Sequence, residues 1–271
     1  MKQPVKVAIL GVSGRMGQML YNAIAQSTEV TLVGVTEKVG HEWVGQDVGR
    51  IIVGKSSGTV VSANPTEVFA STDAVIDFTT PEASVEYSTL AAQARIVHVI
   101  GTTGFNSEQI EKLNLASSHA KLIRAGNMSL GVNLLTKLTQ QVATALDESY
   151  DIEIVEMHHN KKLDAPSGTA LMLGSAAAMG RNETLENSAD YHRNGHTGER
   201  KKGSIGFASL RGGDVVGEHD VIFSGFGERL ILKHIATDRM IFSRGAIKAA
   251  IWGVDKDPGH YDMLDVLGLS K

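Results

Sequence analysis

The sequence contains no cysteine, which excludes disulfides, thiolate nucleophiles and cysteine-based zinc sites. It also has no apolar run that approaches the roughly 18 residues of a membrane-spanning helix. Neither sign of charge is in large excess, because the formal net charge is -4 over 271 residues. Such a balance does not draw a protein toward nucleic acid or an anionic membrane. We therefore expect a cytoplasmic protein with neither kind of partner.

The first half of the chain alternates short β-type runs with helical segments. Several of these runs are apolar throughout, which is typical of a parallel sheet covered on both faces. We therefore predict an α/β fold whose N-terminal part is a Rossmann-type, doubly wound parallel sheet. The expected strands are 5–10, 30–35, 73–78, 96–100 and 121–125, and the expected helices are 15–26, 81–93 and 107–115, the last capped by Ser107.

From about residue 130 the pattern changes to that of a C-terminal α+β domain with a mixed or antiparallel sheet. Consecutive strands separated by Gly-rich turns dominate this part. We expect one domain at 1–129, closed by the C-terminal helical segment 241–271, and a second at 130–240. The expected elements are helices 132–146 and 168–179, strands 151–156, 205–208, 214–216, 219–224 and 229–235, and a closing helix 243–252.

A glycine-rich turn follows the first predicted strand and opens the first helix. Its pattern is GxxGxxG: Gly11 permits a tight turn, Gly14 lets backbone N–H groups approach a pyrophosphate, and Gly17 permits close helix packing. Glu37, twenty residues after Gly17, is placed to accept hydrogen bonds from the adenosine ribose. The adjacent Lys38 is a cation that can pair with a 2′-phosphate, so we expect NADH and NADPH both to bind. The predicted contacts of the turn are Gly11, Val12, Ser13, Gly14, Arg15 and Met16.

Small and polar residues also follow later strands of the predicted sheet. Ligands of doubly wound sheets lie at the carboxyl ends of the strands, so these segments should line the same crevice. We assign further cofactor contacts to Gly101, Thr102, Thr103, Ala125, Gly126, Asn127 and Met128.

The segment 156–170 concentrates groups that transfer protons and bind anions. His158 and His159 follow a strand, and histidine titrates near neutral pH. Lys162 adds a cation and a source of protons. Ser167 is a candidate cap, and the N–H groups of Gly168 and the next residue, at a helix N-terminus, suit a carboxylate. We interpret the segment as a site for a small carboxylate.

Other interpretations of this segment and its surroundings are weaker. His158, His159 and Asp164 are metal-ligand types, but no third ligand has a recognisable spacing, so we predict no metal. A serine nucleophile at Ser167 lacks the GxSxG elbow. A charged surface turn is a further interpretation of this segment. A basic cluster at 192–202 is either a solvated loop or a cover over an anionic substrate, and Arg239 is a candidate to face the site.

The chain closely resembles the dihydrodipicolinate reductase family, also called 4-hydroxy-tetrahydrodipicolinate reductases, over essentially its whole length. The resemblance rests on the glycine turn, on GTTGF at 101–105, on GVN at 131–133 and above all on HHNKKLDAPSGTA at 158–170, with support from 195–200 and 217–219. It implies hydride transfer from NADH or NADPH to a cyclic, unsaturated pyridine dicarboxylate, which yields tetrahydrodipicolinate in lysine and diaminopimelate biosynthesis.

The resemblance also implies roles for individual residues. His158 corresponds to the general acid/base and Lys162 to the proton donor, while the carboxylate binders correspond to His159, Ser167, Gly168 and Thr169. The family implies a homotetramer assembled through the sheet of the second domain. Two departures stand out: Lys38 replaces an arginine of some relatives, which leaves the NADP preference open, and the Asn127-Met128 pair lacks an aromatic residue found in some members.

Two rival functions fit the sequence less well. A regulatory protein that binds a dinucleotide without turnover has no need of a proton donor such as Lys162. A reductase of similar design could act on another acid, such as an amino-acid semialdehyde, but such enzymes often use a catalytic cysteine, which this chain does not contain.

Overall fold

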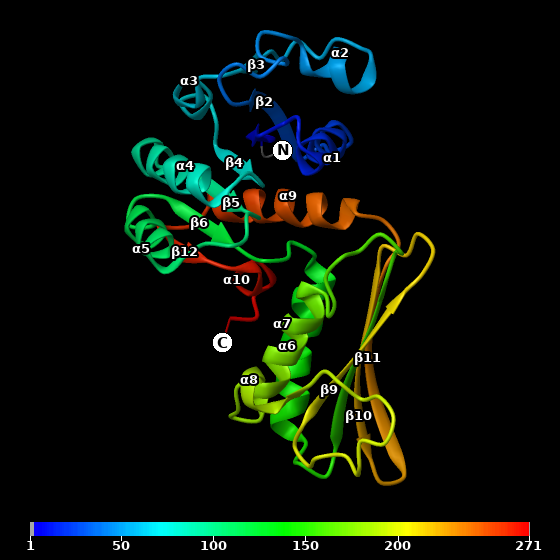
Figure 1. Ribbon diagram of the computed structural model, residues 1–271. Helices are drawn as coiled ribbons and strands as arrows, with labels where there is room; N and C mark the ends of the chain where they lie inside the picture. Colours follow the sequence, from blue (N-terminus) through cyan, green and yellow to red (C-terminus); the bar gives the residue numbers. More distant parts are fainter. Residues whose placement is uncertain (1–2, 271) are drawn as a thin grey trace. The chain divides into compact units, whose positions relative to one another are not determined.

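The chain folds into two compact units, one of which is inserted into the other. The structure, a computed structural model, describes residues 3–270. One unit comprises Met1–Ser129 with Met240–Lys271, and the other comprises Leu130–Arg239 (Figure 1). Within the described residues, no helix is both long enough and apolar enough to cross a membrane.

The first unit contains a seven-stranded sheet in the order β12-β6-β5-β4-β1-β2-β3, and every pair of neighbouring strands is parallel. The predicted Rossmann-type sheet is therefore confirmed. The chain order reverses at β1, which lies between β2 and β4. The strands are β1 (Val5–Leu10), β2 (Val30–Thr36), β3 (Val61–Ser62), β4 (Ala74–Asp77), β5 (Val97–Ile100), β6 (Lys121–Arg124) and β12 (Gly259–Tyr261).

Helices pack on this sheet because its strands are apolar on both faces; β4 and β5 are buried along their whole length. The helices are α1 (Arg15–Ala25), α2 (Val48–Val53), α3 (Pro65–Phe69), α4 (Pro81–Ala94), α5 (Ser107–Ala116), α9 (Met240–Val254) and α10 (Met263–Leu267). One predicted cap is wrong: Asn106, not Ser107, caps α5, in a reciprocal capping box with Gln109. The amide side chain satisfies the N3 donor, which leaves Ser107 as the first helical residue.

The second unit is a five-stranded sheet in the order β11-β10-β7-β9-β8. It is mixed, because β7 is antiparallel to β10 but parallel to β9. Residues 214–216, predicted as a strand, instead form part of the turn between β9 and β10, where Gly213 has a φ of 51°. The elements are α6 (Leu130–Ala145), β7 (Asp151–His158), α7 (Gly168–Gly180), α8 (Leu185–Ser188), β8 (Ala189–Asp190), β9 (Ile205–Arg211), β10 (Gly217–Gly225) and β11 (Glu228–Ala236).

The central strand β7 alternates strictly between buried and half-buried residues. Its buried side chains share a core with α6 and α7, which run along one side of the sheet (Figure 1). Because side chains two apart lie on the same face of a strand, Glu156 and His158 lie on this helix-covered face. The opposite face, which we call the open face, presents apolar side chains; among them Leu210, Ile231 and Ile235 are each about half exposed.

Candidate active site

The glycine turn of the first unit has the geometry that the sequence pattern predicts for close backbone approach. Gly11 has a φ of 68°, and the N–H groups of Gly11 and Val12 donate to the carbonyl of Thr36 at 3.0 and 3.1 Å. A Cβ on Gly17 would lie 2.6 Å from the Gly11 carbonyl oxygen, so only glycine fits there. Gly14 precedes α1 without a side-chain cap, so the first N–H groups of the helix are available to an anion.

Glu37 lies beside this turn. Its Oε1 accepts hydrogen bonds from the backbone N–H and the hydroxyl of Ser13, at 2.9 and 2.6 Å, and its Oε2 accepts from the Lys38 N–H at 3.2 Å. A carboxylate offers about four lone-pair sites, so acceptor capacity remains for ribose hydroxyls. The Lys38 side chain is exposed. The turn and the carboxylate next to it thus fit the adenosine half of a dinucleotide.

The other predicted cofactor contacts differ in exposure. Thr103, Ala125 and Gly126 are exposed or half-buried, whereas the Thr102 side chain is buried and accepts a hydrogen bond from Ser84 at 2.9 Å. Met128 is only 1% exposed. Thr102 and Met128 are therefore limited to backbone contacts. Asn127 accepts from the Ser129 N–H through Oδ1, and Gly101 is required because a Cβ there would lie 2.1 Å from the Phe78 ring.

A buried contact between a carboxylate and an imidazole lies beneath these strand ends, and the sequence pattern did not predict it. The Oδ2 atom of Asp77 lies 3.1 Å from Nε2 of His98, and both side chains are fully buried. Burial alone would raise the pKa of Asp77, but hydrogen bonds from His98 and neighbouring hydroxyls outweigh it and lower the pKa. Thr79 donates to Asp77 through both its N–H and its hydroxyl, and its methyl group packs against Gly11. The sequence feature that could have indicated this contact is Asp77 itself, a carboxylate at the end of an otherwise apolar strand.

In the second unit, His158 is the last residue of β7, its side chain is buried, and one ring nitrogen contacts a carboxylate. Nδ1 lies 2.6 Å from Oε2 of Glu156, and the His219 ring packs edge-on with the two centroids 5.1 Å apart. Burial lowers the pKa of His158, and Glu156 opposes this effect only in part. Because the Glu156 carboxylate accepts the Nδ1 proton, Nε2 is the ring nitrogen that this contact leaves free of Glu156.

Glu156 is a second residue that the sequence did not single out. Arg211 binds it with two hydrogen bonds of 2.8 Å, and the Ser167 N–H donates to Oε1 at 3.2 Å. Burial alone would raise the pKa of Glu156, but the hydrogen bonds from Arg211 and His158 outweigh it and hold the pKa at about 2. Glu156 therefore stays ionised throughout the neutral range.

The first turn of α7 is built on Ser167, which follows the cis peptide bond of Ala165-Pro166. The Ser167 hydroxyl accepts from the Ala170 N–H at 3.1 Å and lies 3.0 Å from Nε2 of His219. This hydroxyl is buried and already bonded, whereas Gly168 is exposed and a Cβ there would meet nothing. The first N–H groups of α7 are thus the part of this turn that suits an external anion.

The remaining loop residues lie near this turn in the chain. Nζ of Lys162 contacts both carboxylate oxygens of Asp164, at 2.8 and 2.9 Å, and Asp164 in turn offers its carbonyl to Arg211. Nη2 of Arg239 lies 3.2 Å from Nε2 of His159, so the structure places this candidate beside one of the predicted site residues. In contrast, the basic cluster at 192–202 directs its two arginines to Glu153 on the open face of β7.

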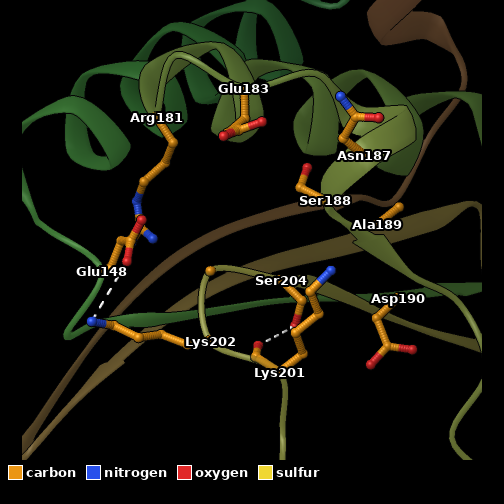
Figure 2. Close-up of a pocket in the computed structure, with 11 residues that line it drawn as sticks. Glu148, Arg181, Glu183, Asn187, Ser188, Ala189, Asp190, Lys201, Lys202 and Ser204 are labelled. Carbon is orange, nitrogen blue, oxygen red and sulfur yellow. Dashed lines mark hydrogen bonds and ion pairs between the residues drawn. The ribbon is translucent and has the colours of Figure 1, made fainter.

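The described residues also bear on a metal site and on a surface pocket. Among residues 3–270, no group of three or more His, Asp or Glu side chains is arranged to hold a metal ion. A pocket of about 400 Å³ opens beside the C-terminal end of α7 and the residues that precede β7 (Figure 2). His158 lies at the other end of β7, so the pocket is separate from the candidate site. Its charges are partly paired, as Lys202 with Glu148, and none of the predicted site residues lines it.

His219 makes the stability of this region depend on pH. Burial lowers its pKa to about 4, whereas the unfolded chain binds a proton near pH 6.5. As the pH falls, the unfolded state therefore binds a proton at this histidine before the native state does. The free energy of unfolding decreases by about 3 kcal/mol between about pH 6.5 and about pH 4. We expect His219→Asn to flatten this part of the stability curve in urea unfolding. His192→Asn, at an exposed histidine of the same unit, should leave this part of the curve unchanged. The prediction would be contradicted if the free energy of unfolding depended equally on pH in the wild type and both variants.

Comparison with known proteins agrees with this arrangement. Residues 5–128 match the family model described as "Dihydrodipicolinate reductase, N-terminus", and residues 131–267 match the one described as "Dihydrodipicolinate reductase, C-terminus". A 4-hydroxy-tetrahydrodipicolinate reductase of Ruegeria pomeroyi is 59% identical over 97% of this chain and 98% of its own length. One from Agrobacterium fabrum is 54% identical over 98% of each chain.

Solved structures show the same likeness. A dipicolinate-bound dihydrodipicolinate reductase from Paenisporosarcina sp. TG-14 has a TM-score of 0.78 and 28% identity, over 97% of this chain and 98% of that one. An amine dehydrogenase from Mycobacterium smegmatis, 14% identical with a TM-score of 0.64 over 94% of each chain, shares the fold alone. With both family models matched over nearly its whole length, the chain belongs to the dihydrodipicolinate reductase family of oxidoreductases.

Proposed function

We propose that the protein reduces 4-hydroxy-tetrahydrodipicolinate to tetrahydrodipicolinate, with loss of water, in lysine and diaminopimelate biosynthesis. The observation that carries the proposal is a buried His158, held by Glu156, that leads directly into a lysine-bearing loop and the first turn of α7. The chain is 54–59% identical to reductases of that name. The dipicolinate in the related solved structure supports a cyclic dicarboxylate as the substrate class.

The first unit would hold the nicotinamide cofactor, which supplies the hydride when bound. The glycine turn, Gly11 to Met16, would bind the pyrophosphate through backbone N–H groups, and Glu37 would accept from the adenosine ribose. The segments 101–103 and 125–128 would approach the rest of the cofactor, with Thr102 and Met128 contributing backbone only. We propose that NADH and NADPH both serve.

The second unit would hold the substrate and provide protons. Gly168 and Thr169, at the start of α7, would bind a carboxylate together with His159, while Ser167 holds that turn in place. Lys162 would leave Asp164 to meet the negative charge of the substrate and donate a proton as charge develops on the ring. His158 would exchange a proton through Nε2, since Glu156 occupies Nδ1.

The direct test is absorbance-monitored oxidation of NADH and NADPH, measured separately. The substrate would be generated in place by a coupled synthase from pyruvate and aspartate semialdehyde. We expect rapid oxidation that depends on the synthase. A folded protein that binds the dinucleotide but oxidises neither cofactor would refute the proposed substrate while leaving the fold intact.

Cofactor preference offers a narrower prediction. Lys38 is an exposed cation next to the proposed ribose carboxylate, so its removal should weaken binding of a 2′-phosphate. An exposed ion pair is worth up to about 1 kcal/mol, so we expect Lys38→Ala to raise KM for NADPH about fivefold while KM for NADH hardly changes. Lys55→Ala, at another exposed lysine of the same unit, is the control. Equal changes for both cofactors would contradict this role.

We further propose a cytoplasmic homotetramer that assembles through the open face of the second sheet. Leu210, Ile231 and Ile235 on this face are 51–53% exposed, which is unusual for large apolar side chains. Their burial against other copies would remove them from water. Light scattering coupled to gel filtration should give about four times the 28.9 kDa chain mass; a monomer at micromolar concentration would refute assembly.

A further inference from the structure

Glu156 lies at the junction of the two parts of the candidate substrate site. On one side its Oε2 takes the Nδ1 proton of His158, and on the other its Oε1 takes the N–H of Ser167, the cap of α7. Arg211 donates to both oxygens and also to the carbonyl of Asp164, the ion-pair partner of Lys162. One buried carboxylate thus contacts the proton-exchanging ring, the anion-binding turn and the arginine that holds the intervening loop.

Every one of these four hydrogen bonds is donated to Glu156, which only a carboxylate can satisfy. A glutamine has one acceptor oxygen and one NH₂ group. If the NH₂ replaces Oε1, it faces the donors of Ser167 and Arg211; if it replaces Oε2, it faces those of His158 and Arg211. Either orientation sets donor against donor or forces the His158 proton from Nδ1 to Nε2.

We propose that Glu156 is a positioning residue whose carboxylate, locked by Arg211, fixes the His158 tautomer and the first turn of α7 together. The inference rests on the role proposed above for His158. It explains why a carboxylate with only 1% exposure is kept on the helix-covered face of β7, where its neighbours Ile152 and Ile154 are apolar. A buried charge is costly unless it is paired and fully hydrogen-bonded, and this one is both.

The charges around His158 predict opposite responses when either partner is removed. The ring faces Glu156 on its own strand, Arg211 at the end of β9, His219 on β10 and, from the loop, Lys162. Glu156 raises the His158 pKa, whereas Arg211 lowers it. Glu156→Gln should therefore lower the His158 pKa, and Arg211→Met should raise it. General damage to the fold does not produce two shifts of opposite sign from one ion pair.

The first measurement follows the His158 ring by NMR in the full-length protein labelled at histidine, assigned by comparison with His158→Asn. It requires no turnover, so it decides the positioning role even if the proposed substrate is wrong. We expect the apparent pKa to move down in Glu156→Gln and up in Arg211→Met. Identical titration of His158 in wild type and both variants, with thermal unfolding still cooperative, would overturn the proposal.

The second measurement is kcat in the coupled assay. Carboxylates that orient metal-bound histidines typically contribute about 10- to 100-fold to activity. Glu156 holds His158 in the same way, so we expect Glu156→Gln to lower kcat by a similar factor. The control is Glu148→Gln in the same unit, an exposed carboxylate that pairs with Lys202 at 3.6 Å before the start of β7, at the end of that strand away from His158; kcat should stay within about twofold, because an exposed ion pair contributes little. Equal losses in both variants would overturn the proposal.

A third substitution covers the case in which Glu156→Gln fails to fold. Glu156→Asp keeps the charge but shortens the side chain, so Arg211 remains paired while the contacts to His158 and Ser167 lengthen. We expect a folded protein with a loss of kcat between those of wild type and the glutamine variant. Wild-type kcat in Glu156→Asp, together with an unshifted His158 titration in Arg211→Met, would overturn the proposal without the glutamine variant.

Discussion

Lys162→Ala is expected to lower kcat by roughly 10²- to 10⁴-fold, the usual contribution of a positioned proton donor. The lysine is mostly buried for a surface-loop cation, with 19% of its side chain exposed, and its ammonium group is held by Asp164 at 2.8 Å. It lies five residues before the cap of α7, so its loss removes a cation and a proton from the proposed carboxylate site. Steady-state oxidation of NADH measures the effect.

Binding of the dinucleotide should survive this substitution, because the glycine turn belongs to the other unit. Fluorescence titration with NADH therefore separates a catalytic defect from misfolding. Lys161→Ala is the matched control, since Lys161 is the adjacent lysine, is exposed and uses its backbone rather than its side chain to contact His159. If Lys162→Ala retained half of the wild-type kcat, Lys162 would not be the proton donor.

Gly17→Ala should produce a large loss of stability and with it a loss of dinucleotide binding. The added Cβ would lie 2.6 Å from the Gly11 carbonyl oxygen and 2.7 Å from both Cα and the carbonyl oxygen of Val12. All three atoms are backbone, so the turn itself must move. Overpacking of this kind costs about 3 kcal/mol, which corresponds to a fall in Tm of roughly 6–12 °C for a unit of this size.

Thermal unfolding and NADH titration of the same variant give both readouts. Gly168→Ala is a suitable control, because its Cβ would meet nothing within 4 Å and its φ is not positive. It should leave Tm and NADH affinity unchanged, although substrate binding at α7 can respond. A wild-type Tm for Gly17→Ala would show that the turn has room to relax and that its third glycine is not required for packing.

Local patterns predicted the long elements of the fold well, because those elements bury one or both faces. The confirmed parallel sheet follows from apolar runs such as β4 and β5. Short elements could not be predicted in this way, because β3, with two residues, and α3, with five, are too short to show a periodic pattern of apolar residues. Residues 214–216 contain two valines, which favour a strand, but the chain turns at Gly213 before β10 begins at Gly217.

Some residues of the candidate site could likewise be predicted from the sequence, and others could not. The sequence predicted a proton-transfer and anion site in 156–170 because those groups are close in the chain. It did not predict Arg211 and His219, which reach the site only through strand register: His158 pairs with Arg211 across β7 and β9, and Glu156 pairs with His219 across β7 and β10. Register depends on contacts 53 to 63 residues apart, which local periodicity does not report.

The insertion of one unit into the other has a consequence for biosynthesis. Translation delivers Leu130–Arg239 as one continuous stretch, whereas the first unit still waits for α9, which packs against α1, β4 and β5, and for the edge strand β12. The unit Leu130–Arg239 can therefore finish folding on the ribosome while the first unit still lacks α9 and β12. Domains that fold as units during synthesis normally do so from the N-terminus onward; here the continuous unit is fully synthesised before the unit that contains β1.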